Sequence, residues 1–137
     1  MNATGEYIAY THTNSVQVYV YNTNTQSWDT YGSSFTGGTT ATTSGIAISD
    51  DGMRVVIGTV GVKVSVYTYD TDWSLSHEVQ ENHPNFADGC VIQGPYILVS
   101  SSGEYGTVHL YTSSLERVYK TSIRATPAGG RGIAMDQ

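Results

Sequence analysis

Residues that could bind a metal or transfer protons are scattered along this chain rather than grouped. The four histidines are His12, His77, His83 and His109, and none shows a metal-ligand spacing such as His-x-Glu-x-x-His. His77 and His109 fall on predicted strands, and His12 and His83 fall in predicted loops. Each is interpreted as a surface or packing histidine. We therefore predict no metal site and no cofactor.

The carboxylates follow a turn pattern rather than a catalytic one. Most of them fall at predicted turns, where Asp favours local hydrogen bonds to the backbone. These turn residues are Asp50, Asp51, Asp70, Asp72, Asp88 and Asp136. No serine occupies a Gly-x-Ser-x-Gly elbow, and the glycine-rich stretches 37–38 and 129–132 lack the Lys-Ser/Thr of a phosphate loop. The sequence indicates that the protein is not an enzyme.

Composition and charge argue against a nucleic-acid-binding protein and against a membrane-spanning one. The chain has 137 residues, a one-domain length, with 6 Lys and Arg against 12 Asp and Glu and a net charge of −6. Because no basic stripe is present, nucleic acid is not an expected partner. No stretch approaches the ~20 apolar residues that span a bilayer, and residues 1–10 lack the basic start and apolar core of a signal peptide. The single Cys90 lies in an apolar run and is expected to be a small buried hydrophobe.

The elements that must position these residues are short β-strands. The abundance of Tyr, Val, Thr and Gly is typical of a β-rich protein, and no capped helical pattern competes. The clearest unit has strands over 45–49, 54–58 and 64–70 and a fourth strand that starts at Trp73, with Asp50-Asp51-Gly52 as the first turn. Segments 32–44 and 121–131 are predicted to be connections.

The same four-strand unit occurs three times. Gly45, Gly89 and Gly132 open equivalent strands at spacings of 44 and 43 residues, which gives repeats over about 1–44, 45–88 and 89–131 in a single domain, 1–137. The first repeat begins at its second strand, Gly5 to Tyr10, and residues 132–136 repeat the sequence of a first strand at the other end of the chain. This offset predicts that residues 132–136 complete a unit that begins without its first strand.

These patterns resemble the blades of known β-propellers. The segment from Gly45 to Trp73 is similar to FG-GAP-like and kelch-like repeats. It has an apolar strand followed by "SDDG", "RVVIG", "VSVYTYD" and a tryptophan, and the resemblance covers nearly the whole chain. It implies an all-β propeller with three four-stranded blades. The calcium loop of integrin-type FG-GAP members has no counterpart here, because Asp50-Asp51-Gly52 is too short and Asp70-Thr71-Asp72 has neither a Gly nor a distal Glu. No metal is therefore carried over.

Three blades are fewer than the four to eight that close a propeller ring. We expect two copies to associate as a symmetric homodimer and to close a six-bladed ring, with residues 132–136 of each chain pairing with the strand at residues 5–10 of the other. The alternative is that the chain is a fragment of a longer propeller.

Recognition residues are expected in the loops and at the strand ends that face the channel. On the third strands, Tyr19, Tyr67 and Tyr111 share one face and are expected to pack between blades. Candidate ligand-binding residues are Tyr31, Tyr105, His12, His83, Asp50 and Asp136, with Phe35 as a further loop aromatic. The predicted function is a non-enzymatic binding or scaffold propeller for a protein or glycan partner, on a composition that suits a virion, cell-surface or other extracellular setting. The alternative is a glycosidase or lyase with carboxylates in the channel.

Overall fold

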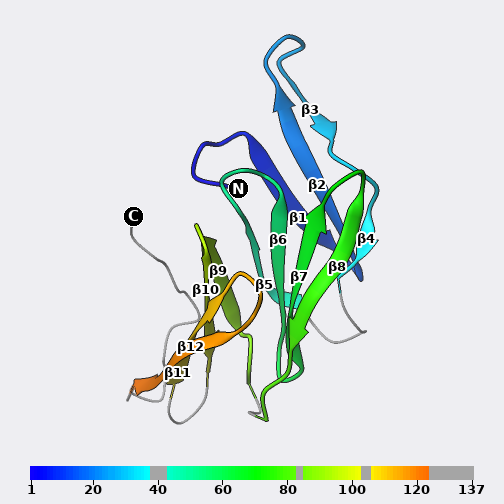
Figure 1. Cartoon of the computed structure of the whole chain (residues 1–137). Coiled ribbons are helices and arrows are strands. Elements are labelled where there is room, and N and C mark those ends of the chain that lie inside the picture. The colour runs from blue at the N-terminus through cyan, green and yellow to red at the C-terminus, as the bar shows by residue number, and fades with distance from the viewer. Residues whose placement is uncertain (38–42, 83–84, 103–105, 124–137) are drawn as a thin grey trace.

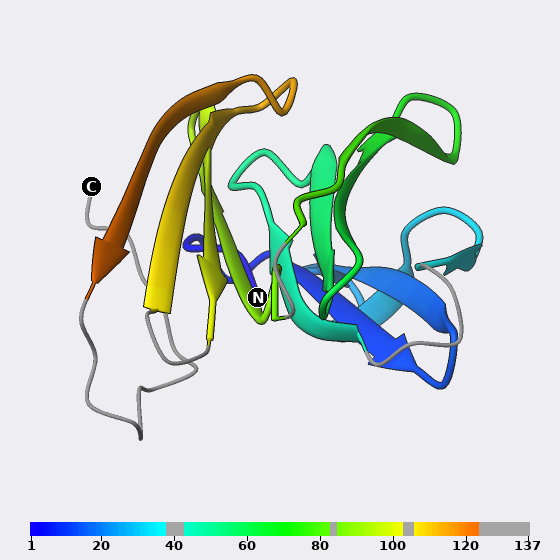
Figure 2. The same cartoon turned by 90° about the horizontal axis from the view of Figure 1, so that it is seen from below.

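The protein consists of β-strands arranged in three four-stranded antiparallel sheets (Figure 1). A computed structural model describes residues 1–37, 43–82, 85–102 and 106–123. We name the sheets blade 1, blade 2 and blade 3 in chain order. Seen from below, the blades fan out from the region where the N-terminus, β5 and β9 lie (Figure 2). The prediction of an all-β chain with three four-stranded units is confirmed.

Blade 2 follows the predicted strand order most closely. Its strands pair in the order β5-β6-β7-β8, with the bounds Thr43–Ile48, Arg54–Thr59, Lys63–Tyr69 and Trp73–Val79. The turn between β5 and β6 contains Gly52 at φ 70°, a left-handed conformation that L-residues with a side chain rarely adopt. Gly52 also lies against the ring of Tyr7, where a Cβ atom would stand only 2.5 Å from ring carbons. A glycine is therefore required at this turn for two reasons.

Blade 3 repeats the order but differs at its first turn and its last strand. Its strands β9, β10, β11 and β12 span Gly89–Gln93, Tyr96–Ser101, Gly106–Thr112 and Arg117–Ile123. The first turn has only two residues, because Gln93 pairs directly with Tyr96. The segment from residue 121 was predicted to be a connection, but β12 continues to Ile123 because it pairs along the whole of β11, where Gly106 is opposite Ile123.

Blade 1 has a broken fourth strand. Its strands β1, β2, β3 and β4 span Tyr7–His12, Ser15–Asn22, Ser27–Thr30 and Phe35–Thr36, and both β3 and β4 pair with β2. The predicted connection from residue 32 thus contains β4. Within the described residues, no strand of blade 1 takes the inner position that β5 and β9 hold in the other blades. Residues 132–136, predicted to supply that strand, lie outside the described part of the chain.

The core lies between the blades, because blade 2 buries both of its faces. Alternate residues of a strand point to opposite faces of its sheet. On β6, Val55 and Ile57 belong to the cluster shared with blade 1, and Val56 belongs to the cluster shared with blade 3. The blade 1–blade 2 junction also contains Val16, Val18, Ile48 and Trp73, and the blade 2–blade 3 junction contains Val64, Val66, Phe86, Ala87, Cys90, Ile92, Ile97, Val99, Tyr111 and Leu115.

Candidate binding site

A cavity of about 400 Å³ lies where the inner ends of the blades meet. The inner strand β5 lies beside both β1 and β9, so all three blades converge at this point. The cavity is lined by the N-terminal segment, by β5 with the turn that follows it, and by β9: Met1, Asn2, Ala3, Ile46, Ala47, Ile48, Asp50, Cys90, Val91, Ile92 and Gln93. Asp50 and Gln93, two residues at the ends of first strands, thus line one cavity.

Asn2 fixes the N-terminal segment against blade 2. Its side chain is buried, its Oδ1 accepts hydrogen bonds from the N–H groups of Glu6 and Tyr7 at 3.0 Å each, and its Nδ2 donates to the carbonyl of Asp50 at 3.0 Å. The N–H of Ala3 donates to Oδ1 of Asp50 at 3.1 Å. These bonds hold one wall of the cavity in place.

Gln93 differs from its equivalents in the other two blades. Asn2 and Ser49 each stand just before a four-residue turn and close it, since their N–H groups bond to the carbonyls of Tyr7 and Arg54. The Ser49 hydroxyl also accepts a bond from the N–H of Arg54 at 3.0 Å. In blade 3 the turn is shorter, and the half-buried Gln93 carboxamide has no hydrogen-bond partner among the described residues. Its amide is thus available to a ligand.

Among the described lining residues of the cavity, Asp50 is the one carboxylate and there is no basic side chain. Asp50 is exposed, and its Oδ1 accepts a hydrogen bond from the N–H of Ala3. Cys90 also contributes to the lining, but burial raises the pKa of its thiol to about 12, and Sγ donates to the carbonyl of Val56 at 3.6 Å. Cys90 is therefore an inert hydrophobe, as the sequence predicted.

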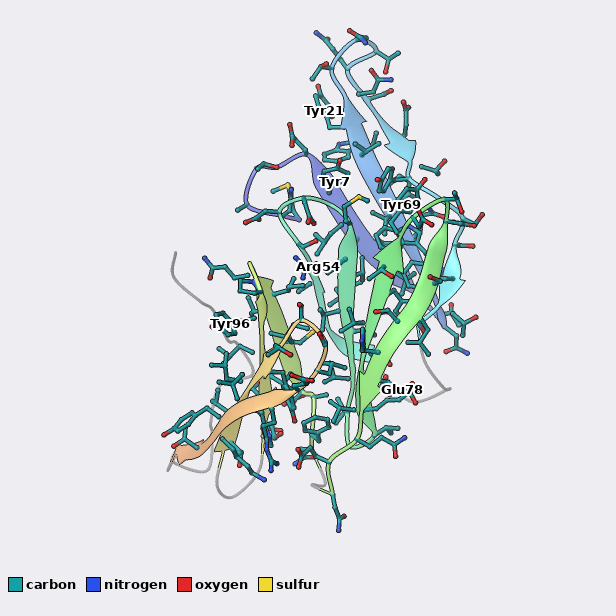
Figure 3. The ribbon with its side chains drawn as sticks, in the orientation of Figure 1. Tyr7, Tyr21, Arg54, Tyr69, Glu78 and Tyr96 are labelled. Atoms are coloured by element: carbon teal, nitrogen blue, oxygen red, sulfur yellow. The ribbon has the colours of Figure 1, made fainter. Side chains whose placement is uncertain are left out.

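A second group of side chains, six aromatic rings, lies at the blade 1–blade 2 junction. We call this set the aromatic cluster: Tyr7, Tyr31, Phe35, Tyr67, Tyr69 and Trp73. Tyr31 stacks on Tyr69 with ring centroids 4.2 Å apart, and Tyr7 lies 5.4 Å from Tyr31. Figure 3 shows Tyr7 and Tyr69 reaching this region from the two blades. Because these rings pack on one another, the cluster is first of all part of the fold.

The break in the fourth strand of blade 1 allows Tyr31 to reach the aromatic cluster. Residues 32–34 leave the sheet after Tyr31, whose N–H still donates to the carbonyl of Val18, and the N–H of Ser33 donates to Oδ1 of Asp72 in the β7–β8 turn at 2.7 Å. Trp73 Nε1 donates to the carbonyl of Tyr31 at 2.8 Å. Gly32, at φ 77°, lies so close to Trp73 that a Cβ atom would be 2.8 Å from Cδ1. These contacts clamp blade 1 to blade 2.

A polar network joins blade 2 to blade 3. Glu81, which follows β8, accepts a hydrogen bond from the hydroxyl of Tyr111 at 3.0 Å and forms an ion pair with Arg117 at 3.0 Å. Burial and the nearby Glu81 carboxylate raise the pKa of Tyr111, so this phenol stays protonated. The ring of the fully buried His109 lies parallel to that of Tyr111 at 6.0 Å. Tyr67 and Tyr111 both pack between blades, as the sequence predicted for third-strand tyrosines. Tyr19, for which the same packing was predicted, alternates with the buried Val18 and so faces away from blade 2.

The candidate ligand-binding residues are not brought together. Asp50 lines the cavity, Tyr31 belongs to the aromatic cluster, and His12 is exposed at the end of β1 rather than in a loop. Tyr105, His83 and Asp136 lie outside the described residues. Sequence reasoning missed Asn2, although its alignment with Ser49 was a usable signal, because both residues precede a four-residue turn that contains a glycine.

The described part of the chain contains neither a metal-binding cluster nor a membrane-spanning helix. No group of three or more His, Cys, Asp or Glu side chains there could hold a metal ion. In the same residues, no helix has the length and apolar character needed to cross a membrane.

Comparison with known proteins identifies the fold as that of a β-propeller. The chain is similar to the β-propeller domain of Cps50 (Swd1) from Myceliophteria thermophila, with a TM-score of 0.61 and 14% identity over 89% of this chain and 37% of that chain. It is also similar to a europium-containing methanol dehydrogenase, with a TM-score of 0.56 and 14% identity over 85% of this chain and 22% of that chain. At this identity the likeness shows the fold alone.

The chain spans little more than a third of the propeller domain and less than a quarter of the dehydrogenase. No protein-family model matches it, and the comparison with curated proteins found no match. The kind of repeat, FG-GAP-like or kelch-like, therefore stays a prediction.

Proposed function

We propose that the protein is a non-enzymatic binding and scaffold propeller in which two copies close a six-bladed ring. Blade 3 of each copy packs on blade 1 of the other, so that the two new junctions are identical. The observation that carries the proposal is that equivalent positions are buried between blades but uncovered on the outer faces of blades 1 and 3. The ring in turn presents its loops and inner cavities to a protein or glycan partner.

The outer face of blade 1 carries side chains whose equivalents in the other blades are covered. Tyr10 is equivalent to Ile57 and Val99 in the other blades. Each of the three pairs with the residue that lies two positions before the equivalent tyrosine of its third strand, which is Tyr19, Tyr67 or Tyr111. Ile57 and Val99 are 0% exposed, whereas Tyr10 is 54% exposed. Trp28 pairs with Tyr21 as Trp73 pairs with Tyr69, yet it is 39% exposed against 8% for Trp73. Blade 1 thus has the surface of a blade that lacks a neighbour.

The outer face of blade 3 shows the complementary pattern. Leu98 pairs with Leu110 as Val56 pairs with Val66, but the two valines are 0% exposed and the two leucines are only half-buried. Tyr119, opposite Leu110, extends the apolar row and is 60% exposed. This face corresponds to the side of blade 2 that covers blade 3. It therefore has the pattern needed to cover blade 1 of a second copy.

Much of the exposed aromatic surface belongs to these two faces. Tyr10, Tyr21 and Trp28 lie on blade 1, and Tyr96 and Tyr119 on blade 3, and all five are exposed large side chains. Figure 3 shows Tyr21 on the β2–β3 hairpin and Tyr96 well apart from it, on blade 3. Exposed aromatic patches of this kind mark protein–protein contacts. In the proposed ring, residues 132–136 of each chain pair with β1 of the other, which the sequence of the repeat supports.

The molecular mass in solution tests the ring. A folded dimer of twice 14.8 kDa in light scattering is the expected result. A folded monomer at working concentration would overturn the proposal and favour a fragment of a longer propeller, in which other blades cover the same two faces.

The lining of the cavity supports the proposal that the protein is not an enzyme. A glycosidase needs two carboxyl groups about the scissile bond, and the described lining has Asp50 next to carboxamides instead. A lyase or glycosidase activity on a panel of polysaccharides, abolished by Asp50→Asn, would contradict this assignment.

A further inference from the structure

We propose that the cavity between β5 and β9 is a subsite for one uncharged sugar unit of a glycan. This proposal rests on the binding role proposed above and names its ligand class. The lining residues all come from one chain, so the subsite exists in each copy independently of ring closure. Its volume of about 400 Å³ lies in the range of about 300–1,000 Å³ that small-molecule sites occupy.

The first argument is the difference between the three strand ends. Asn2 and Ser49 close their own turns, whereas the two-residue turn of blade 3 leaves the Gln93 carboxamide without a partner among the described residues. A carboxamide offers two donors and an acceptor. A half-buried amide at a cavity wall can therefore both donate to and accept from neighbouring hydroxyl groups.

The second argument is the geometry around Asp50. Its Oδ1 is held by the N–H of Ala3, and its carbonyl by Nδ2 of Asn2. The carboxylate is thereby fixed on the cavity wall while Oδ2 has no hydrogen-bond partner among the described residues. An ionised carboxylate only accepts hydrogen bonds. Asp50 therefore selects a ligand group that donates a hydrogen bond, as a sugar hydroxyl does.

The third argument is the rest of the lining. Ala47, Val91 and Ile92 contribute apolar surface, which suits the C–H face of a sugar ring. At Asp50 an anionic ligand group is disfavoured, because the carboxylate repels it and the described lining has no basic side chain. One acceptor, one mixed donor and acceptor, and an apolar surface together match a neutral polyhydroxyl ring.

Saturation-transfer NMR with a panel of neutral methyl glycosides tests the proposal on the full chain. At least one glycoside is expected to receive saturation from the protein. Asp50→Asn, whose amide oxygen can still accept from the N–H of Ala3, and Gln93→Ala are each expected to weaken that binding about tenfold or more, the effect of losing one hydrogen bond in a charged or buried setting. The matched controls Asp70→Asn and Gln80→Ala, at exposed positions outside the cavity, are expected to bind as the parent protein does.

A cationic ligand is the rival, and Gln93→Glu separates it from a sugar. This variant keeps the length of the side chain but replaces the NH2 donors with a second carboxylate, so it is expected to weaken glycoside binding, and lysine amide is expected not to bind the parent protein. Lysine amide that binds the parent protein, binds Gln93→Glu more tightly and is released by salt would overturn the proposal. A folded dimer that takes up no glycoside would also overturn it while leaving the ring intact, whereas a folded monomer that binds a glycoside would refute the ring alone.

Discussion

Blades 2 and 3 share one strand order, and blade 1 repeats part of it, but in the described part of the chain only blade 2 is covered by protein on both faces. Val56 and Val66 face blade 3, and Val55 and Ile57 face blade 1, and all four are fully buried. The equivalent positions on the outer faces of blades 1 and 3 carry residues that are just as large and apolar but are partly uncovered. The exposure of these faces therefore reflects where each blade stands in the row and not a change in the chemistry of the repeat.

The two junctions that exist also differ from each other. Blade 1 meets blade 2 through six aromatic rings and a clamp that includes Asp72, whereas blade 2 meets blade 3 mainly through aliphatic side chains, with Phe86 and Tyr111 among them, and through the Glu81 network. The same backbone geometry thus accepts different side-chain solutions. The aromatic outer face of blade 1, with Tyr10, Tyr21 and Trp28, is closer in character to the first of these junctions.

The largest expected effect compares a covered position with its uncovered equivalent. Val66→Asp buries a carboxylate between two blades without a partner, which costs several kcal/mol or more, a large part of the ~5–15 kcal/mol that stabilises a domain. Leu110→Asp introduces the same group on the outer face of blade 3. Circular dichroism is expected to show an unfolded or severely destabilised Val66→Asp and a folded Leu110→Asp, and light scattering a monomer for the latter. Equal loss of structure in both variants would contradict the comparison.

The next effect compares the two equivalent tryptophans. Trp73→Ala removes a buried ring from the aromatic cluster and its bond to the carbonyl of Tyr31, which should lower the free energy of unfolding by about 3–5 kcal/mol. Trp28→Ala removes a partly exposed ring, so it should change the unfolding of the isolated copy much less and raise the dissociation constant of the dimer instead. Denaturant unfolding and dilution-dependent light scattering measure the two quantities. An unchanged dissociation constant in Trp28→Ala would argue against this part of the ring interface.

The sequence predicted the three repeats, the strand order and the inter-blade tyrosines, because those follow from period-two alternation and from turn residues such as Asp50-Asp51-Gly52. It did not predict the clamp. Residues 32–34 were predicted to belong to a polar connection, and the partner of Ser33 is Asp72, far away in the sequence. The freed amide of Gln93 was hidden for a similar reason, since it depends on a turn that is two residues shorter than its equivalents. Local pattern gives the strands, whereas contacts between blades depend on tertiary placement.

A smaller effect is expected from Gly32→Ala, which tests the clamp without altering either blade. The residue has φ 77°, and its Cβ would lie 2.8 Å from Trp73 and 2.9 Å from Asp72. Strain in a left-handed conformation together with this crowding should lower the free energy of unfolding by about 1–3 kcal/mol. Denaturant unfolding measures it. Gly94→Ala is the control, because Gly94 also has positive φ but has no atom within 4 Å of a Cβ, so any excess in Gly32→Ala reports the clamp.

The smallest effect concerns how the free energy of unfolding falls at low pH. Hydrogen bonds from the N–H groups of Ser33 and Trp73 hold the pKa of Asp72 below its ordinary value of 3.8. The unfolded chain therefore takes up this proton first as the pH falls, so the contribution of Asp72 is complete above pH 3.8 and is lost as the pH drops from there through the folded-state pKa. Asp72→Asn can still accept one of these bonds but cannot titrate. Its unfolding free energy should fall less steeply below pH 3.8 than that of the parent protein. Equal slopes in the Asp72→Asn variant and the parent would show that Asp72 does not link the clamp to pH.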